Sequence, residues 1–156
     1  MKLINNKQST ISNLAFTLIE IIVVVTIIGV LFGGAAISYS SLTRASRDAK
    51  RKGDLEQIRA ALELYRSSEP SANGQYPTFA IANCSGLSGI PNFGNYLPQI
   101  PTDPKAGSNY SCVSSASTYT LYTTIEGGAY ASCGGSCGAA TPCEYSIGPY
   151  GKICGP

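Results

Sequence analysis

The sequence predicts an α+β protein in which a long N-terminal helix packs on a small antiparallel sheet within a loop-rich, disulfide-bonded C-terminal head. First, no proline occurs between Phe16 and Glu69, so no helix breaker interrupts this stretch. Second, the side chains from Tyr119 to Ile125 divide into two alternating faces, as in a β-strand. Third, all six cysteines follow residue 80, which places the cross-links in the C-terminal part.

The predicted helix begins near Phe16 and continues to about residue 68, and Pro70 then ends it. Its first part, residues 16–37, is apolar, with Glu20 as its one charged residue. A run of this length can span a bilayer, which requires roughly 20 apolar residues in a helix. Because a lone carboxylate in such a run costs a few kcal/mol or more, Glu20 is expected to meet a cation.

The second part of the helix, residues 38–69, is amphipathic. Four large apolar side chains recur there at helical spacing on one face: Leu55, Ile58, Leu62 and Tyr65. We expect this stripe to pack under the head, residues 70–156. In the head, strands are expected at Tyr110–Val113 and Tyr119–Ile125, and residues 127–156, rich in Gly and Cys, are expected to form loops or short strands.

All six cysteines are candidates for disulfide bonds: Cys84, Cys112, Cys133, Cys137, Cys143 and Cys154. An even number in a short domain beyond a membrane-length segment indicates a disulfide framework in an oxidising compartment. Many pairings are possible, and the spacing does not choose among them. A zinc site formed by the last four cysteines is the alternative, but their spacing is loose, and no metal site is predicted.

The composition argues against an enzyme. Histidine is absent, which removes the usual general base and excludes Ser-His-Asp and Cys-His mechanisms. After residue 70 the acids are Asp103, Glu126 and Glu144, too widely spaced to predict a paired-carboxylate site. Asp103 precedes Pro104 and is interpreted as a turn residue. The net charge of +2 is too small to indicate a nucleic-acid partner, and no cofactor is predicted.

A basic run from Arg44 to Lys52 follows the apolar segment. The simpler interpretation is a solvated helix face, with Asp48, Asp54 and Glu56 as partners in i, i+3 or i, i+4 pairs. Binding of DNA or anionic lipid is the alternative. Counted as membrane-flanking charge, the run would place the C-terminal part in the cytoplasm, but the cysteines favour the opposite, oxidising side.

Residues 1–15 contain Lys2 and Lys7 and no acid, as expected of a cytoplasmic leader that is later removed. The leader is followed by Phe16-Thr17-Leu18-Ile19-Glu20 and an apolar helix. This combination resembles the class III signal of type IV pilins and type II secretion pseudopilins. The proline-rich segment 97–104 is similar to the segment before the sheet in the major pseudopilins of type II secretion.

The resemblance implies that a prepilin peptidase cuts between Ala15 and Phe16 and methylates the new amine of Phe16. The family usually has glycine before the cut, and this chain has Ala15, the next smallest side chain. Glu20 would become the fifth mature residue and would pair with the Phe16 ammonium of a neighbouring subunit. Major pseudopilins often bind calcium through an acidic C-terminal loop, which has no counterpart here, so calcium is not predicted.

The resemblance also implies a structural role as a subunit of a type IV pilus-like filament or a type II secretion pseudopilus. The expected partners are further copies of the chain in a helical filament, minor pilins or pseudopilins, the prepilin peptidase and an assembly platform. Before assembly the chain would cross the cytoplasmic membrane once, with its N-terminus inside and its head outside. The filament would then lie at the cell surface or in the periplasm. A pilus, a secretion pseudopilus and a DNA-uptake fibre stay open, as do major or minor status and any ligand of the head.

Two other interpretations compete with this one. In the first, residues 1–36 contain a conventional secretory signal, cut after Ala36, and the product is a secreted or anchored disulfide-rich binding domain; Glu20 would then have no role. In the second, the chain is a single-pass anchored enzyme, which the missing histidine and the scarce acids disfavour. The mature N-terminus separates the first alternative from the pilin interpretation.

Overall fold

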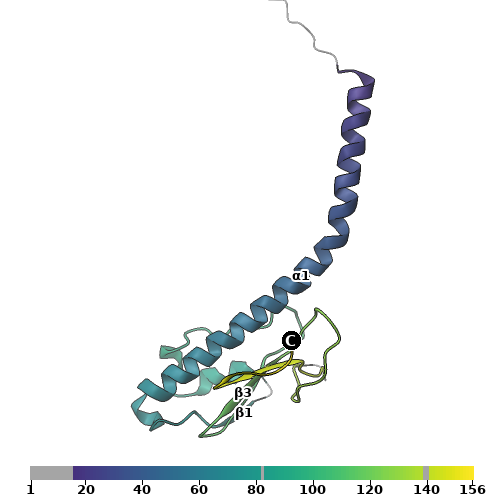
Figure 1. Cartoon of the computed structure of the whole chain (residues 1–156). Coiled ribbons are helices and arrows are strands. Elements are labelled where there is room, and N and C mark those ends of the chain that lie inside the picture. Colours follow the sequence, from purple (N-terminus) through teal and green to yellow (C-terminus); the bar gives the residue numbers. More distant parts are fainter. Residues whose placement is uncertain (1–15, 82, 139–140) are drawn as a thin grey trace, which may run out of the picture. The chain divides into compact units, whose positions relative to one another are not determined.

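The computed structural model describes residues 16–81, 83–138 and 141–156. It confirms the predicted α+β fold, because a long helix, α1 (Leu18–Ser68), precedes a five-stranded antiparallel sheet (Figure 1). The chain divides into two compact units, one ending at Tyr39 and the other beginning at Ser40. The first unit therefore holds the apolar part of α1, and the second holds the rest of α1 with the sheet.

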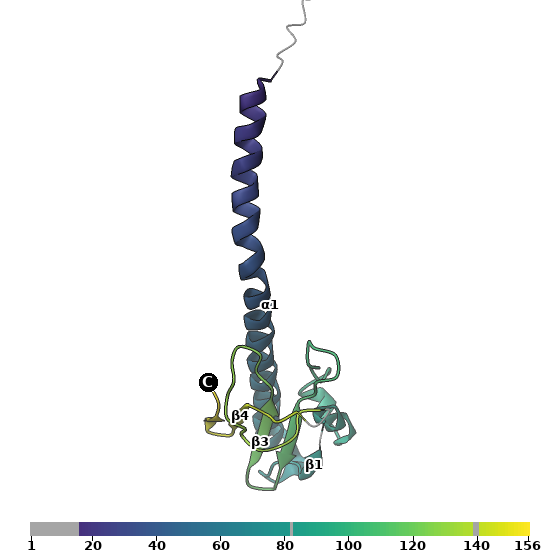
Figure 2. The same ribbon diagram turned by 90° about the vertical axis from the view of Figure 1, so that its right-hand side faces the viewer.

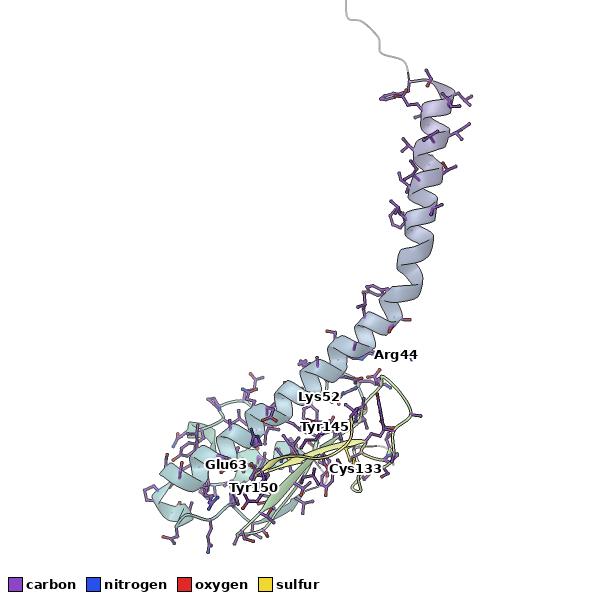
Figure 3. All side chains as sticks on the ribbon, viewed as in Figure 1. Arg44, Lys52, Glu63, Cys133, Tyr145 and Tyr150 are labelled. Carbon is purple, nitrogen blue, oxygen red and sulfur yellow. A yellow bond between two sulfur atoms is a disulfide. The ribbon has the colours of Figure 1, made fainter. Side chains whose placement is uncertain are left out.

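Side chains extend from every side of α1 in the first unit (Figure 3). The large apolar residues from Leu18 to Phe32 are 46 % to 78 % exposed. No proline interrupts this part of the helix. Glycine, which also disfavours a helix, occurs only at Gly29, Gly33 and Gly34. Within this unit, nothing in the described chain covers these side chains.

The sheet has the strand order β1-β2-β3-β4-β5, and every neighbouring pair is antiparallel. The strands are β1 (Phe79–Ile81), β2 (Ser111–Ser114), β3 (Tyr119–Thr123), β4 (Tyr145–Gly148) and β5 (Gly151–Cys154). Leu121 is paired with Cys112 on one side and with Ile147 on the other. Three short 3-10 helices occupy Pro70–Ala72, Cys84–Gly89 and Phe93–Asn95.

The predicted strands agree with β2 and β3 to within a residue or two at their ends. β4 and β5 lie in residues 127–156, where loops or short strands were expected. β1 was not predicted, because a strand of three residues is too short to show a period of two.

The predicted apolar stripe of α1 forms the core of the second unit. Leu55, Ile58 and Leu62 have no exposed surface, and Tyr65 is 6 % exposed. Figures 1 and 2 both show the second half of α1 running along the sheet, where the stripe joins buried sheet residues such as Leu121 in one cluster. Pro70 then opens a 3-10 turn that leads the chain away from the helix.

Two acids at the edges of this stripe bind tyrosine hydroxyls from the head. The Tyr110 hydroxyl donates to Asp54 at 2.6 Å, and the hydroxyls of Tyr76 and Tyr119 donate to Glu63 at 2.8 Å and 2.9 Å. Burial, helped by these carboxylates, raises the pKa of Tyr110 and Tyr119 well above its usual value. Asp54 is therefore a packing contact of the head, and the predicted helix-surface pairing for it was wrong.

All six cysteines form disulfides: Cys84–Cys112, Cys133–Cys154 and Cys137–Cys143. Cys84–Cys112 lies in the core and ties the 3-10 helix at Cys84–Gly89 to β2. Cys133–Cys154 joins the loop before β4 to the end of β5. The expected disulfide framework is present, and the structure selects one pairing among those that the spacing left open.

We expect the disulfides to carry much of the stability of this small head. Replacing Cys84 and Cys112 by alanine should reduce the free energy of unfolding by about 2–5 kcal/mol, as is typical for a native disulfide in a small domain. Replacing Cys137 and Cys143 should cost less, because their separation of six residues closes a much shorter loop than the separation of 28. Denaturant unfolding of the full chain in detergent measures both, and wild-type stability of the first variant would contradict the prediction.

Candidate functional site

The first turn of α1 is closed by reciprocal hydrogen bonds between Thr17 and Glu20. The Glu20 backbone N–H donates to Thr17 Oγ1 at 3.3 Å. The Thr17 backbone N–H and hydroxyl both donate to Glu20 Oε2, at 3.4 Å and 3.3 Å. This is a capping box with Thr17 as the N-cap, and the carboxylate also lies at the positive end of the helix dipole. The sequence signal, Thr-x-x-Glu before an apolar run, was available, but this local role was not predicted.

Both capping contacts of the carboxylate fall on Oε2, so Oε1 has no partner among the described residues. Glu20 also forms no ion pair within the described part of the chain. Phe16 precedes the helix and is 77 % exposed. Ala15 lies outside the described residues, and cleavage before Phe16, its methylation and its pairing with Glu20 stay predictions.

The rest of the apolar surface carries no polar side chain in need of a partner. The Thr26 hydroxyl donates to the Val23 carbonyl within the helix at 2.8 Å. A Cβ added at Gly29 or Gly33 would meet nothing within 4 Å, so packing inside the chain does not require these glycines. Their G-x-x-x-G spacing permits close approach of another helix. An apolar surface of this extent indicates contact with lipid or with other proteins.

No single helix of the described residues meets the length and hydropathy requirements for a membrane span. The segments Leu18–Gly34 and Tyr39–Ser68 meet them only when they are taken together. The predicted span at residues 16–37 accordingly stays a prediction.

A second group of charged residues is buried between α1 and two loops of the head. We call it the ion cluster, and it consists of Arg47, Asp48, Arg51, Asp103 and Glu126. The Arg51 side chain has no exposed surface and lies at the centre. Its Nε and Nη2 donate to the two oxygens of Asp103 at 2.8 Å and 2.9 Å. It also contacts Asp48 at 2.8 Å and Glu126 at 2.7 Å.

The outer members of the ion cluster extend it to the backbone. Arg47 Nε donates to Glu126 Oε1 at 3.0 Å. The Asp48 carboxylate accepts hydrogen bonds from the backbone N–H groups of Glu126 and Gly127, at 3.0 Å and 2.9 Å. Among the described residues, every buried polar side-chain atom has a hydrogen-bond partner. The charges of the cluster are therefore all paired; the side chains of Arg51 and Asp103 are fully buried, and that of Arg47, at the edge, is 30 % exposed.

The ion cluster corrects two interpretations of the sequence. The run from Arg44 to Lys52 is not simply a solvated face: Arg44 and Lys50 are exposed, but Arg51 is buried, and Asp48 is only one of its three partners. Asp103 is more than a turn residue. It does accept the Lys105 backbone N–H at 2.8 Å, as a turn requires, but its side chain is fully buried against Arg51.

Lys52, at the end of the basic run, is also engaged. Its ammonium lies over the ring of Tyr145, 5.1 Å from the ring centre, and the two side chains are neighbours in Figure 3. This is a cation–π interaction, in which the negative face of an aromatic ring attracts a cation.

Mutual hydrogen bonding shifts the pKa values of the cluster in opposite directions. The hydrogen bond from Arg47, opposed by partial burial and reinforced by Arg51, lowers the pKa of Glu126 to about 2. Burial alone would lower the pKa of Arg51, but its hydrogen bonds to Asp103, Glu126 and Asp48 outweigh burial and raise it. Both residues are charged at neutral pH.

Comparison with known proteins gives one family match, to the prokaryotic N-terminal methylation motif over residues 12–36. The match covers Phe16–Glu20 and most of the apolar part of α1. It supports recognition of a type IV pilin or pseudopilin type of protein, a structural class processed by a prepilin peptidase and anchored to the membrane through its N-terminal part. No curated protein and no solved structure shows a significant match.

The low pKa of Glu126 predicts a loss of stability in acid. The pKa of Glu126 is about 2 in the folded chain and 4.5 ordinarily. The contribution of this carboxylate to the free energy of unfolding is therefore complete above pH 4.5 and is lost as the pH falls towards 2. Glu126→Gln should lower the melting temperature at neutral pH and flatten this acid dependence. Arg47→Gln should move the dependence to higher pH, because it removes the largest cause of the low pKa. Thermal unfolding of the full chain in detergent tests this, and identical acid profiles for wild type and Glu126→Gln would contradict it.

Proposed function

We propose that the chain is a structural subunit of a helical filament, either a type IV pilus-like fibre or a type II secretion pseudopilus. The observation that carries this proposal is one carboxylate, Glu20, at the start of an exposed apolar helix that matches the methylation motif. In this proposal residues 1–15 are removed, residues 16–37 form the membrane span and later the filament core, and residues 38–69 support the head, 70–156.

Filament assembly gives the exposed apolar side chains of α1 a partner. Neighbouring helices bury one another's surfaces, and the Gly29 and Gly33 pair allows their backbones to approach closely. Before assembly, lipid covers the same surface. The transfer from lipid to a helix bundle supplies little hydrophobic free energy, so polar contacts and close packing determine how the helices are arranged.

The proposed polar contact is between Glu20 and the methylated ammonium of Phe16 in the adjacent subunit. Methylation keeps the positive charge of an amine. Since the capping box uses Oε2, Oε1 is available to accept a hydrogen bond from that ammonium. A cation left without this partner in an apolar core costs roughly 3–5 kcal/mol, so the pair selects one axial position of each subunit.

The three disulfides support a location of the head outside the cytoplasm, because disulfides persist in oxidising compartments. The cytoplasmic membrane before assembly, with the N-terminus inside, is the proposed storage site. The alternative, secretion after a cut behind Ala36, would discard the capping box and the whole matched motif, residues 12–36, and no feature of the described head favours it.

We expect the mature chain to begin with N-methylated Phe16. The reason is the motif match across the predicted cut, with small Ala15 at the position that the peptidase must accommodate. Mass spectrometry of N-terminal peptides from membrane and filament fractions measures the terminus, and cells without prepilin peptidase provide the uncleaved control. A terminus at Ile37 would support conventional secretion, and an intact leader in assembled filaments would contradict the proposal.

Loss of the Glu20 charge should prevent assembly without preventing membrane insertion. Glu20→Gln keeps an oxygen for the capping box and removes the charge, so it should reduce filament yield to less than about a tenth of wild type, as Glu20→Ala should. Glu20→Asp, shorter by one methylene, should be intermediate. Insertion should be equal or better, since the apolar run loses a charge.

Thr17→Ala is the matched control for this series. It removes the hydroxyl of the capping box but leaves the charge at Glu20, so its filament yield should remain close to wild type. The amount of protein in sheared filaments is compared with the amount in membranes. Normal yield from Glu20→Gln would show that the charge has no role in assembly.

A further inference from the structure

Two long stretches of the head lack regular secondary structure, apart from one isolated bridge between Ser136 and Pro142. They are residues 96–110, between the last 3-10 helix and β2, and the described residues 124–138 and 141–144, between β3 and β4. Disulfides hold Cys133, Cys137 and Cys143 of the second stretch, whereas residues 127–132, before them, contain no cysteine. The ion cluster connects both loops to α1, through Asp103 in the first and Glu126 in the second.

We infer that the ion cluster is a positioning device that holds both loops in one place on α1, so that the head offers each new subunit a preformed surface during filament assembly. Arg51 is its central positioning residue. The inference rests on the proposed filament function and assigns to these buried charges a part in assembly beyond the folding of the head.

The first loop packs against the core near its two ends, through Leu97, Ile100 and Tyr110, and Asp103 holds its middle. Between Leu97 and Tyr110, both buried, no residue as a whole is buried, and half of these twelve residues are exposed. The Asp103 side chain is the exception, since it is fully buried and bound by both donor groups of the Arg51 fork. The position of the middle of this loop therefore depends largely on one bidentate contact, which fixes direction as well as distance.

The second loop is held at its beginning. Glu126 takes charged hydrogen bonds from Arg47 and Arg51, and the backbone N–H groups of Glu126 and Gly127 donate to Asp48. The next residues, 127–132, are all exposed. The direction in which this exposed stretch leaves the head is thus determined where it leaves the ion cluster.

Directional contacts of this kind specify an arrangement more than they add net stability. The cluster brings two cations together with three carboxylates, and backbone N–H groups satisfy the remaining oxygens. A displaced loop would leave a carboxylate without donors in a buried position, so alternative positions are disfavoured. Filament assembly is then more favourable, because adding a subunit costs no further conformational entropy for ordering the two loops.

Arg51→Lys tests this inference with the charge retained. An ammonium has no planar fork, so it cannot make the bidentate contact to Asp103 and also bind Asp48 and Glu126 in the same geometry. We expect a wild-type level of membrane protein and intact disulfides. We also expect faster hydrogen exchange at the Glu126 and Gly127 amides, unchanged exchange in β3, and a filament yield about tenfold lower.

Two control variants separate positioning from general stability. Arg59→Lys makes the same substitution on the same helix, in a pair with Glu56 whose side chains are 33 % and 48 % exposed, and should assemble normally. Ile58→Val removes one methyl group from the core and should lower the melting temperature without changing exchange at Gly127. Its filament yield should stay close to wild type.

Wild-type filament yield from Arg51→Lys would overturn the inference. An equal fall in yield for Ile58→Val, at a matched loss of melting temperature, would also overturn it, because stability alone would then explain the defect. The proposed function is tested separately: normal assembly of Glu20→Gln contradicts the filament-core contact and leaves the comparison between Arg51→Lys and Arg59→Lys intact.

Discussion

The head depends on the burial of one apolar stripe of α1. Leu55, Ile58 and Leu62 are completely covered, and they belong to one core cluster with side chains from β1 to β4 and from two of the 3-10 helices. The stripe is narrow, so the polar residues beside it also contact the head and need hydrogen-bond partners there. Asp54 and Glu63 do so by accepting hydrogen bonds from tyrosines whose rings belong to the core. Arg51 does so through the ion cluster.

The same helix meets two different environments along its length. In the first unit it is apolar all round and has no partner in the described chain, and in the second it is amphipathic and largely covered on one side. Glu20 belongs to the first unit but acts locally on its helix end, through the capping box with Thr17. A carboxylate can cap its own helix and still present a second oxygen to another chain, so the local role and the proposed assembly role are compatible.

The sequence predicts those parts of the fold that depend on local patterns. The absence of proline predicts α1, the spacing of Leu55, Ile58 and Leu62 predicts its buried face, and alternation predicts β3. β1 was missed because three residues carry no period. The ion cluster was missed because Arg51 and Asp103 are 52 residues apart, and no local pattern links them.

The residues of the candidate site also divide into those that a local sequence pattern predicts and those that it does not. Phe16–Glu20 is a contiguous motif, and the family match agrees with it. The cysteines indicate that disulfides form, but their pairing depends on which loops lie together in space. The capping box could have been predicted from its spacing, whereas the burial of Asp103 could not, since a residue before proline on the surface of a turn has the same sequence signature.

The acidic side chains of this protein act as hydrogen-bond acceptors within the fold. The chain has nine acidic residues, and each accepts at least one hydrogen bond: Glu20, Asp48, Asp54, Glu56, Glu63, Glu69, Asp103, Glu126 and Glu144. Glu69 joins the end of α1 to Asn92, and Glu144 holds the Ile125 backbone. Six of these carboxylates connect α1 or its end to the loops and strands of the head: Asp48, Asp54, Glu63, Glu69, Asp103 and Glu126. Glu20 and Glu56 bind within the helix. These contacts are directional, so together they fix where the loops and strands of the head lie on α1.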